Sequence, residues 1–171
     1  MQGLREIWGP KVTGTSAWTD QADGHRSKRH RNPLALAEKI MFVKNLSTDL
    51  WGEPTDVEDD DVPRPSWPQI ETAIRALDGK RRTMVILGAD GESHLTVGGG
   101  SSNRYVVYMT FDNMKFLNLM SRDRADKTVT LFVGGQDGLF PDNTVVDIAL
   151  ALRAAKAFAE TGQPDPSCKW S

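Results

Sequence analysis

The C-terminal part of the chain, from Phe132 to Ser171, constrains the fold most, because strand, turn and helix signals follow one another closely there. The Gly134-Gly135 pair follows an apolar run that is typical of a strand. Asp147 is a favourable N-cap for a helix from about Ile148 to Thr161, which Gly162 is placed to end. The alanines of this segment permit close approach to a sheet. We therefore expect a long C-terminal helix packed on a sheet.

A second helix signal lies near the middle of the chain. Ser66 and Gln69 form the Ser-x-x-Gln pattern of a capping box, and Pro68 stands in the first turn, where its missing N–H group does no harm. Apolar residues then follow at helical spacing, and the Asp78-Gly79 pair is expected to stop the helix. The residues that would form its apolar face are Ile70, Ala73, Ile74 and Leu77.

Strand signals fill the region between the two helices. They cover residues 83–87, 94–97, 104–110 and 127–133, with a short piece at 145–146, whereas 114–120 fits either a helix or a strand. The short connections favour antiparallel pairing. The fold class that we predict is α+β: a mainly antiparallel sheet of about four to six strands, with an N-terminal-side helix and a long C-terminal helix packed on it.

Charge divides the chain into two parts. Residues 1–40 hold seven Lys/Arg and four Asp/Glu, a net charge of +3, whereas residues 41–171 hold fourteen and nineteen, a net charge of −5. The first part also lacks helical or strand periodicity. We interpret residues 1–40 as a poorly structured basic extension and residues 41–171 as one domain, beginning near Met41 or Asp49. Residues 49–65, acidic and with three prolines, are expected to be irregular.

Several functional classes receive no support from the composition. The longest apolar stretch falls far short of the roughly 20 residues of a membrane helix. A single cysteine precludes an internal disulfide, and the three histidines show no zinc-ligand spacing. We expect a cytoplasmic protein, monomeric by default, without a metal or cofactor. No nucleophile elbow or other catalytic motif occurs, so an enzyme is not expected.

Two alternative functions remain open at this point. The loop from Gly98 to Asn103 contains three glycines whose N–H groups could hold a phosphate, which would make the chain a small-ligand or nucleotide-binding domain. Neither a dinucleotide-binding nor a P-loop pattern is present, however, and glycines of this kind more commonly allow tight connections. The basic tract from Arg26 to Arg31 could contact nucleic acid, although charge runs are usually solvated.

An acidic segment is the best candidate for a binding surface. Six carboxylates lie within nine positions, preceded by a tryptophan. Charges this dense repel one another and stay solvated, so a flexible loop is one interpretation. Recognition of a basic protein surface is the other, with the tryptophan as an aromatic anchor. The candidate residues are Trp51, Glu53, Asp56, Glu58, Asp59, Asp60 and Asp61.

The order of the motifs over residues 66–171 resembles the immunity protein 1 family of bacterial polymorphic toxin systems. The matching elements are Val97-Gly98-Gly99-Gly100, Arg104 with Val106-Val107, Val133-Gly134-Gly135, Val145-Val146-Asp147, Ala154-Ala155, and Pro164 followed after five residues by Trp170. We interpret Gly98, Gly99, Arg104, Gly134, Gly135, Asp147 and Trp170 as scaffold residues, with Trp170 packed on the domain.

The resemblance implies an α+β inhibitor that has no chemistry of its own. Its final helix and tail look similar to those of an immunity protein that acts against a double-stranded DNA deaminase toxin. The expected partner is therefore the effector domain of a cognate toxin, often of the deaminase class, whose active site the inhibitor covers. Nucleic acid and membranes are not expected partners. The family varies its toxin-contacting positions, so no contact residue is transferred to this sequence.

Overall fold

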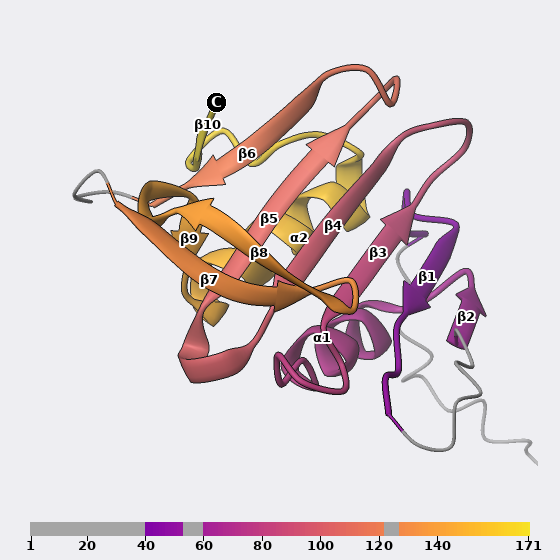
Figure 1. Cartoon of the computed structure of the whole chain (residues 1–171). Helices are drawn as coiled ribbons and strands as arrows, with labels where there is room; N and C mark the ends of the chain where they lie inside the picture. The colour runs from indigo at the N-terminus through magenta and orange to yellow at the C-terminus, as the bar shows by residue number, and fades with distance from the viewer. Residues whose placement is uncertain (1–39, 53–59, 122–126) are drawn as a thin grey trace, which may run out of the picture. The chain divides into compact units, whose positions relative to one another are not determined.

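In the part of the chain that the structure describes, the main sheet has eight strands, and all of its strand pairs are antiparallel. The computed structural model describes residues 40–52, 60–121 and 127–171. Seven strands are ordered β10-β6-β5-β4-β3-β1-β2, and β9 pairs with the part of β5 that β6 leaves open (Figure 1). The strands are β1 (Asn45–Thr48), β2 (Asp60–Pro63), β3 (Met84–Gly88), β4 (His94–Gly99), β5 (Tyr105–Thr110), β6 (Phe116–Met120), β9 (Val145–Val146) and β10 (Lys169–Trp170).

Helix α1 (Trp67–Arg75) begins where the capping-box pattern predicts. The Ser66 N–H donates to the Gln69 side-chain oxygen at 2.8 Å, which satisfies a donor that the helix itself leaves free. Ile70 and Ile74 are buried on one face, as is Leu77 just beyond the helix. Three of the four residues predicted for the apolar face are therefore buried, and the fourth, Ala73, is half-buried against the same core.

Helix α2 (Ile148–Thr161) has the predicted bounds. The Asp147 carboxylate accepts from the Leu150 N–H at 2.9 Å, and Gly162 ends the helix with a φ of 70°. Four buried alanines form the surface with which α2 approaches the sheet, together with the fully buried Phe158: Ala151, Ala154, Ala155 and Ala159.

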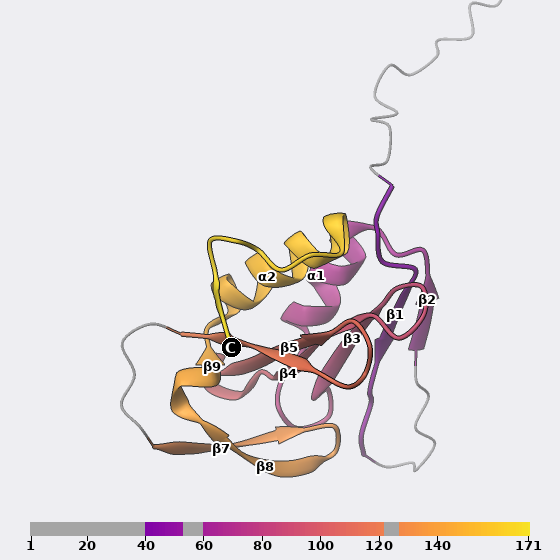
Figure 2. The same ribbon diagram turned by 90° about the horizontal axis from the view of Figure 1, so that it is seen from above.

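Both helices lie on the same face of the main sheet, and the principal core lies between them and the sheet (Figure 2). Val85, Val97 and Val107 are paired across β3, β4 and β5 and point into this core. Because neighbouring residues along a strand point to opposite faces, Ile86, Thr96 and Tyr108 belong to the other face.

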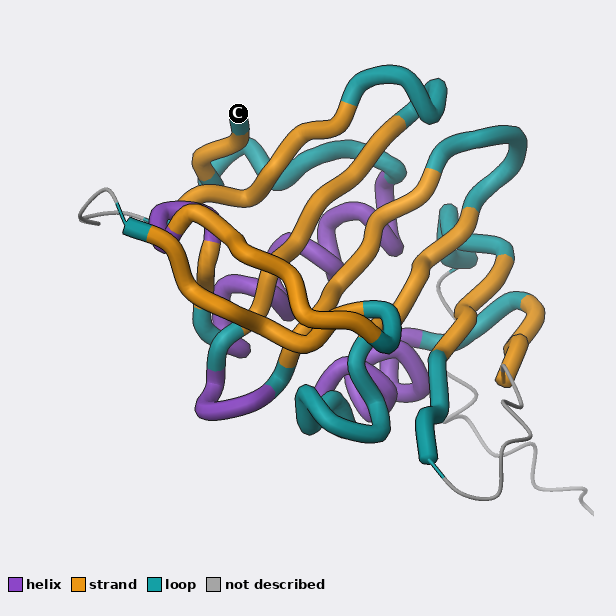
Figure 3. The backbone as a smooth tube through the Cα atoms, in the orientation of Figure 1, coloured by secondary structure: helices purple, strands orange, loops and turns teal. Residues whose placement is uncertain are grey.

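A separate hairpin covers part of that other face. It is formed by β7 (Thr128–Val133) and β8 (Gln136–Pro141), which pair only with each other among the described strands. Leu131 of the hairpin packs with Val106 and Val145 of the sheet in a second, smaller core. Figure 3 shows that the hairpin crosses the sheet near one end, whereas the β3–β4 and β5–β6 turns lie at the opposite end.

The α+β class, the antiparallel sheet and the two helices agree with the prediction, but the predicted number of four to six strands is too low. Three short strands at or near the edges had no sequence signal: β1 and β2 have four residues each and β10 has two. Residues 60–63, expected to be irregular, form β2, where Pro63 is tolerated because the strand is at the edge. The ambiguous segment 114–120 contains β6, and 127–133 forms part of the hairpin instead of the main sheet.

Candidate functional site

Three of the seven predicted binding residues lie in the described part of the chain. Glu53, Asp56, Glu58 and Asp59 fall outside the described residues. Asp60 and Asp61 are exposed on the edge strand β2. The Asp61 carboxylate accepts hydrogen bonds from the side chains of Ser47 and Asn45 on β1, which hold it in place at the edge of the sheet.

The pairing register places Asp61 on the sheet face opposite the helices. Directly paired residues share a face, and Asp61 heads a row that crosses six strands from β2 to β6. The row consists of Asp61, Ser47, Ile86, Thr96, Tyr108 and Asn118. With about 4.8 Å between strands, the five steps span about 24 Å. We call Asp60 and Asp61 on β2 the acidic edge. The acidic edge and the β5–β6 end of the sheet are thus two ends of the same face.

Trp51 is half-buried and lies against the turn of the β7–β8 hairpin. A Cβ atom added to Gly135 would lie 2.1 Å from Cζ2 of the Trp51 ring, so the ring occupies the space that a larger residue would need. The structure therefore brings together a predicted binding residue and a predicted scaffold residue. Much of the Trp51 ring is used for packing within the protein.

A buried carboxylate holds Trp51 in this position. Asp49 is 7% exposed, and its oxygens accept from the Trp51 indole N–H and the backbone N–H groups of Thr83 and Met84, each at 2.7 Å. The Thr83 hydroxyl also hydrogen-bonds to Asp49, and the Gly135 N–H donates to that hydroxyl at 3.2 Å. Four donors thus converge on the Asp49 carboxylate from the segments that follow β1 and begin β3, and the Thr83 hydroxyl links this group to the hairpin turn. Sequence analysis did not identify Asp49, because this role depends on partners 34 residues away.

The glycine loop is occupied by the protein itself. A Cβ added to Gly98 would lie 2.4 Å from Cγ1 of Val133. The Gly99 N–H donates to the Thr83 carbonyl and the Gly100 N–H to the Arg104 carbonyl, both at 2.9 Å, so these donors are already used. Such engagement favours the structural interpretation of the loop over the phosphate-binding one.

The loop also supports the start of α2. The Asn103 side-chain oxygen accepts from the Ile148 N–H at 3.1 Å, at the first turn of that helix. Gly99 and Gly134 adopt positive φ, and the exposed Arg104 lies directly before β5. At the other end of the chain, Trp170 packs against the principal core, and its indole N–H donates to the Asp165 carbonyl at 3.2 Å.

An apolar groove with a volume of about 490 Å³ lies between α1 and the β1–β2 edge. Leu46, Val62 and Ala73 contribute to its lining, and Asp60 and Arg82 are its charged lining residues. No residue from Gly98 to Asn103 lines it, so this groove is not the polar pocket that a ligand-binding glycine loop predicts.

Sequence analysis missed an exposed apolar surface at the β5–β6 end of the sheet. Phe111 and Phe116 are 44% and 46% exposed, and Met114 is 83% exposed. The Phe116 ring makes edge contacts with Tyr108 and His94, at centroid distances of 6.0 and 6.3 Å. Large apolar residues in a hairpin turn were the available signal, since turns usually contain small or polar residues. We call Tyr108, Phe111, Met114, Phe116 and His94 the β5–β6 patch.

Two further properties concern the described residues alone. No group of three or more His, Cys, Asp or Glu side chains in residues 40–52, 60–121 and 127–171 is arranged to hold a metal ion. Neither helix of this part is long and apolar enough to cross a membrane. The basic tract from Arg26 to Arg31 lies outside the described residues.

Comparison with known proteins places the chain in a family. No curated protein and no solved structure gave a significant match. The model of the family described as immunity protein Imm1 matches residues 58–171, a range that excludes β1, begins just before β2 and continues through α1, all later strands and α2. The match supports an immunity, or antitoxin, role and implies a toxin as partner. The chain belongs to the immunity protein Imm1 family.

Proposed function

We propose that this protein binds the effector domain of a cognate polymorphic toxin in the cytoplasm of the bacterium that makes it, and blocks the active site of that domain. The proposed toxin acts on nucleic acid and is of the deaminase class. The protein contributes contacts and carries out no reaction. Membership of the Imm1 family supports the antitoxin role, and the resemblance of the final helix and tail supports the choice of toxin class.

The observation that carries the proposed mode of binding is the position of the acidic edge. Asp60 and Asp61 are exposed on β2 and continue the acidic run of the sequence, and Asp61 faces the side of the sheet away from the helices. An enzyme that acts on nucleic acid has a basic substrate cleft, because it must bind phosphates. An acidic edge is the electrostatic complement of such a cleft and would accelerate association.

The dimensions of the face are compatible with this role. A standard interface buries about 800 Å² on each partner, which corresponds to a patch about 30 Å across. The row from Asp61 to Asn118 spans about 24 Å, and Thr96 in its middle is buried, so one partner of this size would contact the two ends of the row and not its whole length.

The proposal predicts that a toxin effector domain is encoded beside the gene for this protein, and that domain is the partner used in the test. A catalytically inactive form of that domain is titrated with the full chain by calorimetry, and the active form is assayed for deamination with increasing amounts of the chain. We expect a complex with a Kd below 1 μM and complete inhibition at an equimolar ratio. The absence of a complex at micromolar concentration, or a complex that leaves deamination unchanged, would contradict the proposal.

The acidic edge is tested separately by charge reversal. Asp61→Lys changes the charge by two units and removes hydrogen bonds to β1. The matched control is Glu71→Lys, which makes the same charge change on α1 and removes hydrogen bonds from Arg75. We expect Asp61→Lys to slow association about tenfold at low salt and to weaken its salt dependence, because steering depends on local charge. Equal association rates for the two variants would show that the acidic edge does not take part in the interface.

A further inference from the structure

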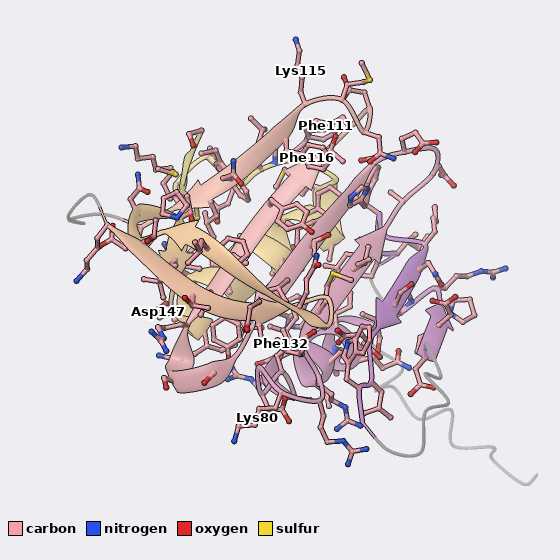
Figure 4. The ribbon with its side chains drawn as sticks, in the orientation of Figure 1. Lys80, Phe111, Lys115, Phe116, Phe132 and Asp147 are labelled. Carbon is pink, nitrogen blue, oxygen red and sulfur yellow. The ribbon has the colours of Figure 1, made fainter. Side chains whose placement is uncertain are left out.

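The β5–β6 patch is built as a rigid, exposed apolar surface. The Asp112 carboxylate accepts from the N–H groups of Met114 and Lys115 at 2.9 and 3.0 Å, and the Thr110 hydroxyl accepts from the Asn113 N–H at 3.0 Å. These bonds fix the turn that carries the exposed side chains. Figure 4 shows Phe111 and Phe116 at this end of the sheet, with Lys115 at the tip of the turn.

A second connection ties this turn to its neighbour. The Asn113 side-chain amide donates to the Glu92 carboxylate at 2.7 Å, which joins the β5–β6 turn to the β3–β4 turn. The edge contact between the Phe116 and His94 rings joins the same two strand pairs. A surface held in one arrangement loses little conformational entropy on binding, so its apolar contacts contribute more fully to affinity. Rigid turns therefore make this patch suited to binding.

The two turns at the patch carry more carboxylates than basic groups, and these carboxylates form an acidic rim. Asp90 and Glu92 lie in the β3–β4 turn and Asp112 lies in the β5–β6 turn. Lys115 is the single Lys or Arg residue in these two described turns. An apolar centre with a charged rim is the usual composition of a protein interface. The acidic rim favours a partner whose apolar surface is bordered by basic side chains. Two copies of this chain would bring like charges together, which disfavours a symmetric dimer through the patch.

We propose that the β5–β6 patch is the apolar anchor of the toxin interface, and that it receives an apolar surface of the toxin domain bordered by Lys or Arg. This inference rests on the proposed function and specifies which part of the chain carries the binding energy. The strand residues of the patch, Tyr108, Phe116 and His94, share a face with Asp61 and lie at its opposite end, so the acidic edge steers the toxin and the patch holds it. Exposed apolar clusters of this kind mark interaction surfaces, and aromatic side chains dominate binding energies.

The test compares two exposed apolar residues in the full chain. Met114→Lys removes an apolar contact and adds a charge of the same sign as the expected partner rim, whereas Leu139→Lys makes the same change on β8 at a residue that is 73% exposed. The inactive toxin domain encoded beside the gene is the probe, and calorimetry measures its Kd. We expect Met114→Lys to weaken binding about 30-fold, the effect of losing a hot-spot residue. Leu139→Lys should change the Kd by less than about threefold.

Each outcome separates this inference from the function on which it rests. If the unmodified chain forms no complex, the proposed function fails and the anchor with it. If the unmodified chain binds and Met114→Lys binds as tightly, or if both variants lose affinity equally, the anchor alone is overturned. Sedimentation of the free chain is the third readout, because self-association that Met114→Lys abolishes would assign the patch to a second copy. Phe111→Ala adds no charge, and we expect it to weaken binding about tenfold. That result would show that the apolar contact itself contributes to the affinity.

Discussion

Gly98 provides the sharpest test of how the hairpin is attached to the sheet. It was predicted to be a scaffold residue that permits a tight connection, but it lies in β4 without a positive φ. Its role is instead close approach, because a Cβ added there would lie 2.4 Å from Cγ1 and 3.1 Å from Cγ2 of Val133 on β7. Ordinary contacts of a Cβ atom begin at 3.4 Å, so Gly98→Ala requires a shift of about 1 Å.

The magnitude follows from the packing. Inserting a methyl group into a filled site costs about 1–3 kcal/mol of stability. Replacing glycine also restricts the unfolded chain, which stabilises the folded protein by about 0.4–1 kcal/mol and offsets part of this cost. We expect Gly98→Ala to lower the free energy of unfolding by about 1–2 kcal/mol. Val133→Ala removes two methylene equivalents from a half-buried side chain and should cost about 1 kcal/mol. In the double variant the clashing atoms are absent, so the alanine at position 98 should cost nothing further.

The unmodified chain, the two single variants and the double variant form a double-mutant cycle. Urea unfolding of each full chain, monitored by fluorescence, measures its free energy of unfolding. The expected coupling energy between the two sites is about 1–2 kcal/mol, whereas independent sites add within about 0.5 kcal/mol. Gly88→Ala is the matched control, since a Cβ there would meet Asn45 at an ordinary 3.8 Å and the φ is again not positive. Additive effects, or a Gly98→Ala variant as stable as Gly88→Ala, would refute the reasoning.

Three further predictions concern named carboxylates. Asp147→Ala should lower the free energy of unfolding by about 1 kcal/mol in urea, because the Leu150 N–H loses its cap, and Asp147→Asn should retain most of it. Asp49→Ala should cost about 3 kcal/mol, since it leaves buried N–H donors without an acceptor, whereas Asp61→Ala on the exposed edge should cost less than 1 kcal/mol. Backbone hydrogen bonds from Lys115 and Met114 lower the pKa of Asp112 below its ordinary 3.8, so the charged carboxylate stabilises the turn above that pH and the effect is lost as the pH falls through the lowered pKa. An NMR titration of the Asp112 carboxyl with a midpoint at or above 3.8 would contradict this last expectation.

The site was less predictable than the fold. The sequence pointed to the acidic run, of which Asp60 and Asp61 are described and lie at an exposed edge. It also pointed to Trp51, whose ring packs on Gly135. The β5–β6 patch was not foreseen, because its members come from β4, β5, β6 and a turn, and become one surface only through strand pairing.

What the sequence determined by itself is the set of structures held together by near neighbours. The Ser66 and Asp147 caps, the end of α2 at Gly162 and the strands from β3 to β5 depend on residues within a few positions. Their signals can therefore be recognised in the sequence alone. Tertiary structure alone decided that β7 and β8 cross the sheet instead of joining it, and that short polar strands complete its edges. Those outcomes depend on contacts between distant segments, such as Val133 over Gly98 and Thr83 on Asp49, whose free energies exceed the weak local preferences of the strands involved.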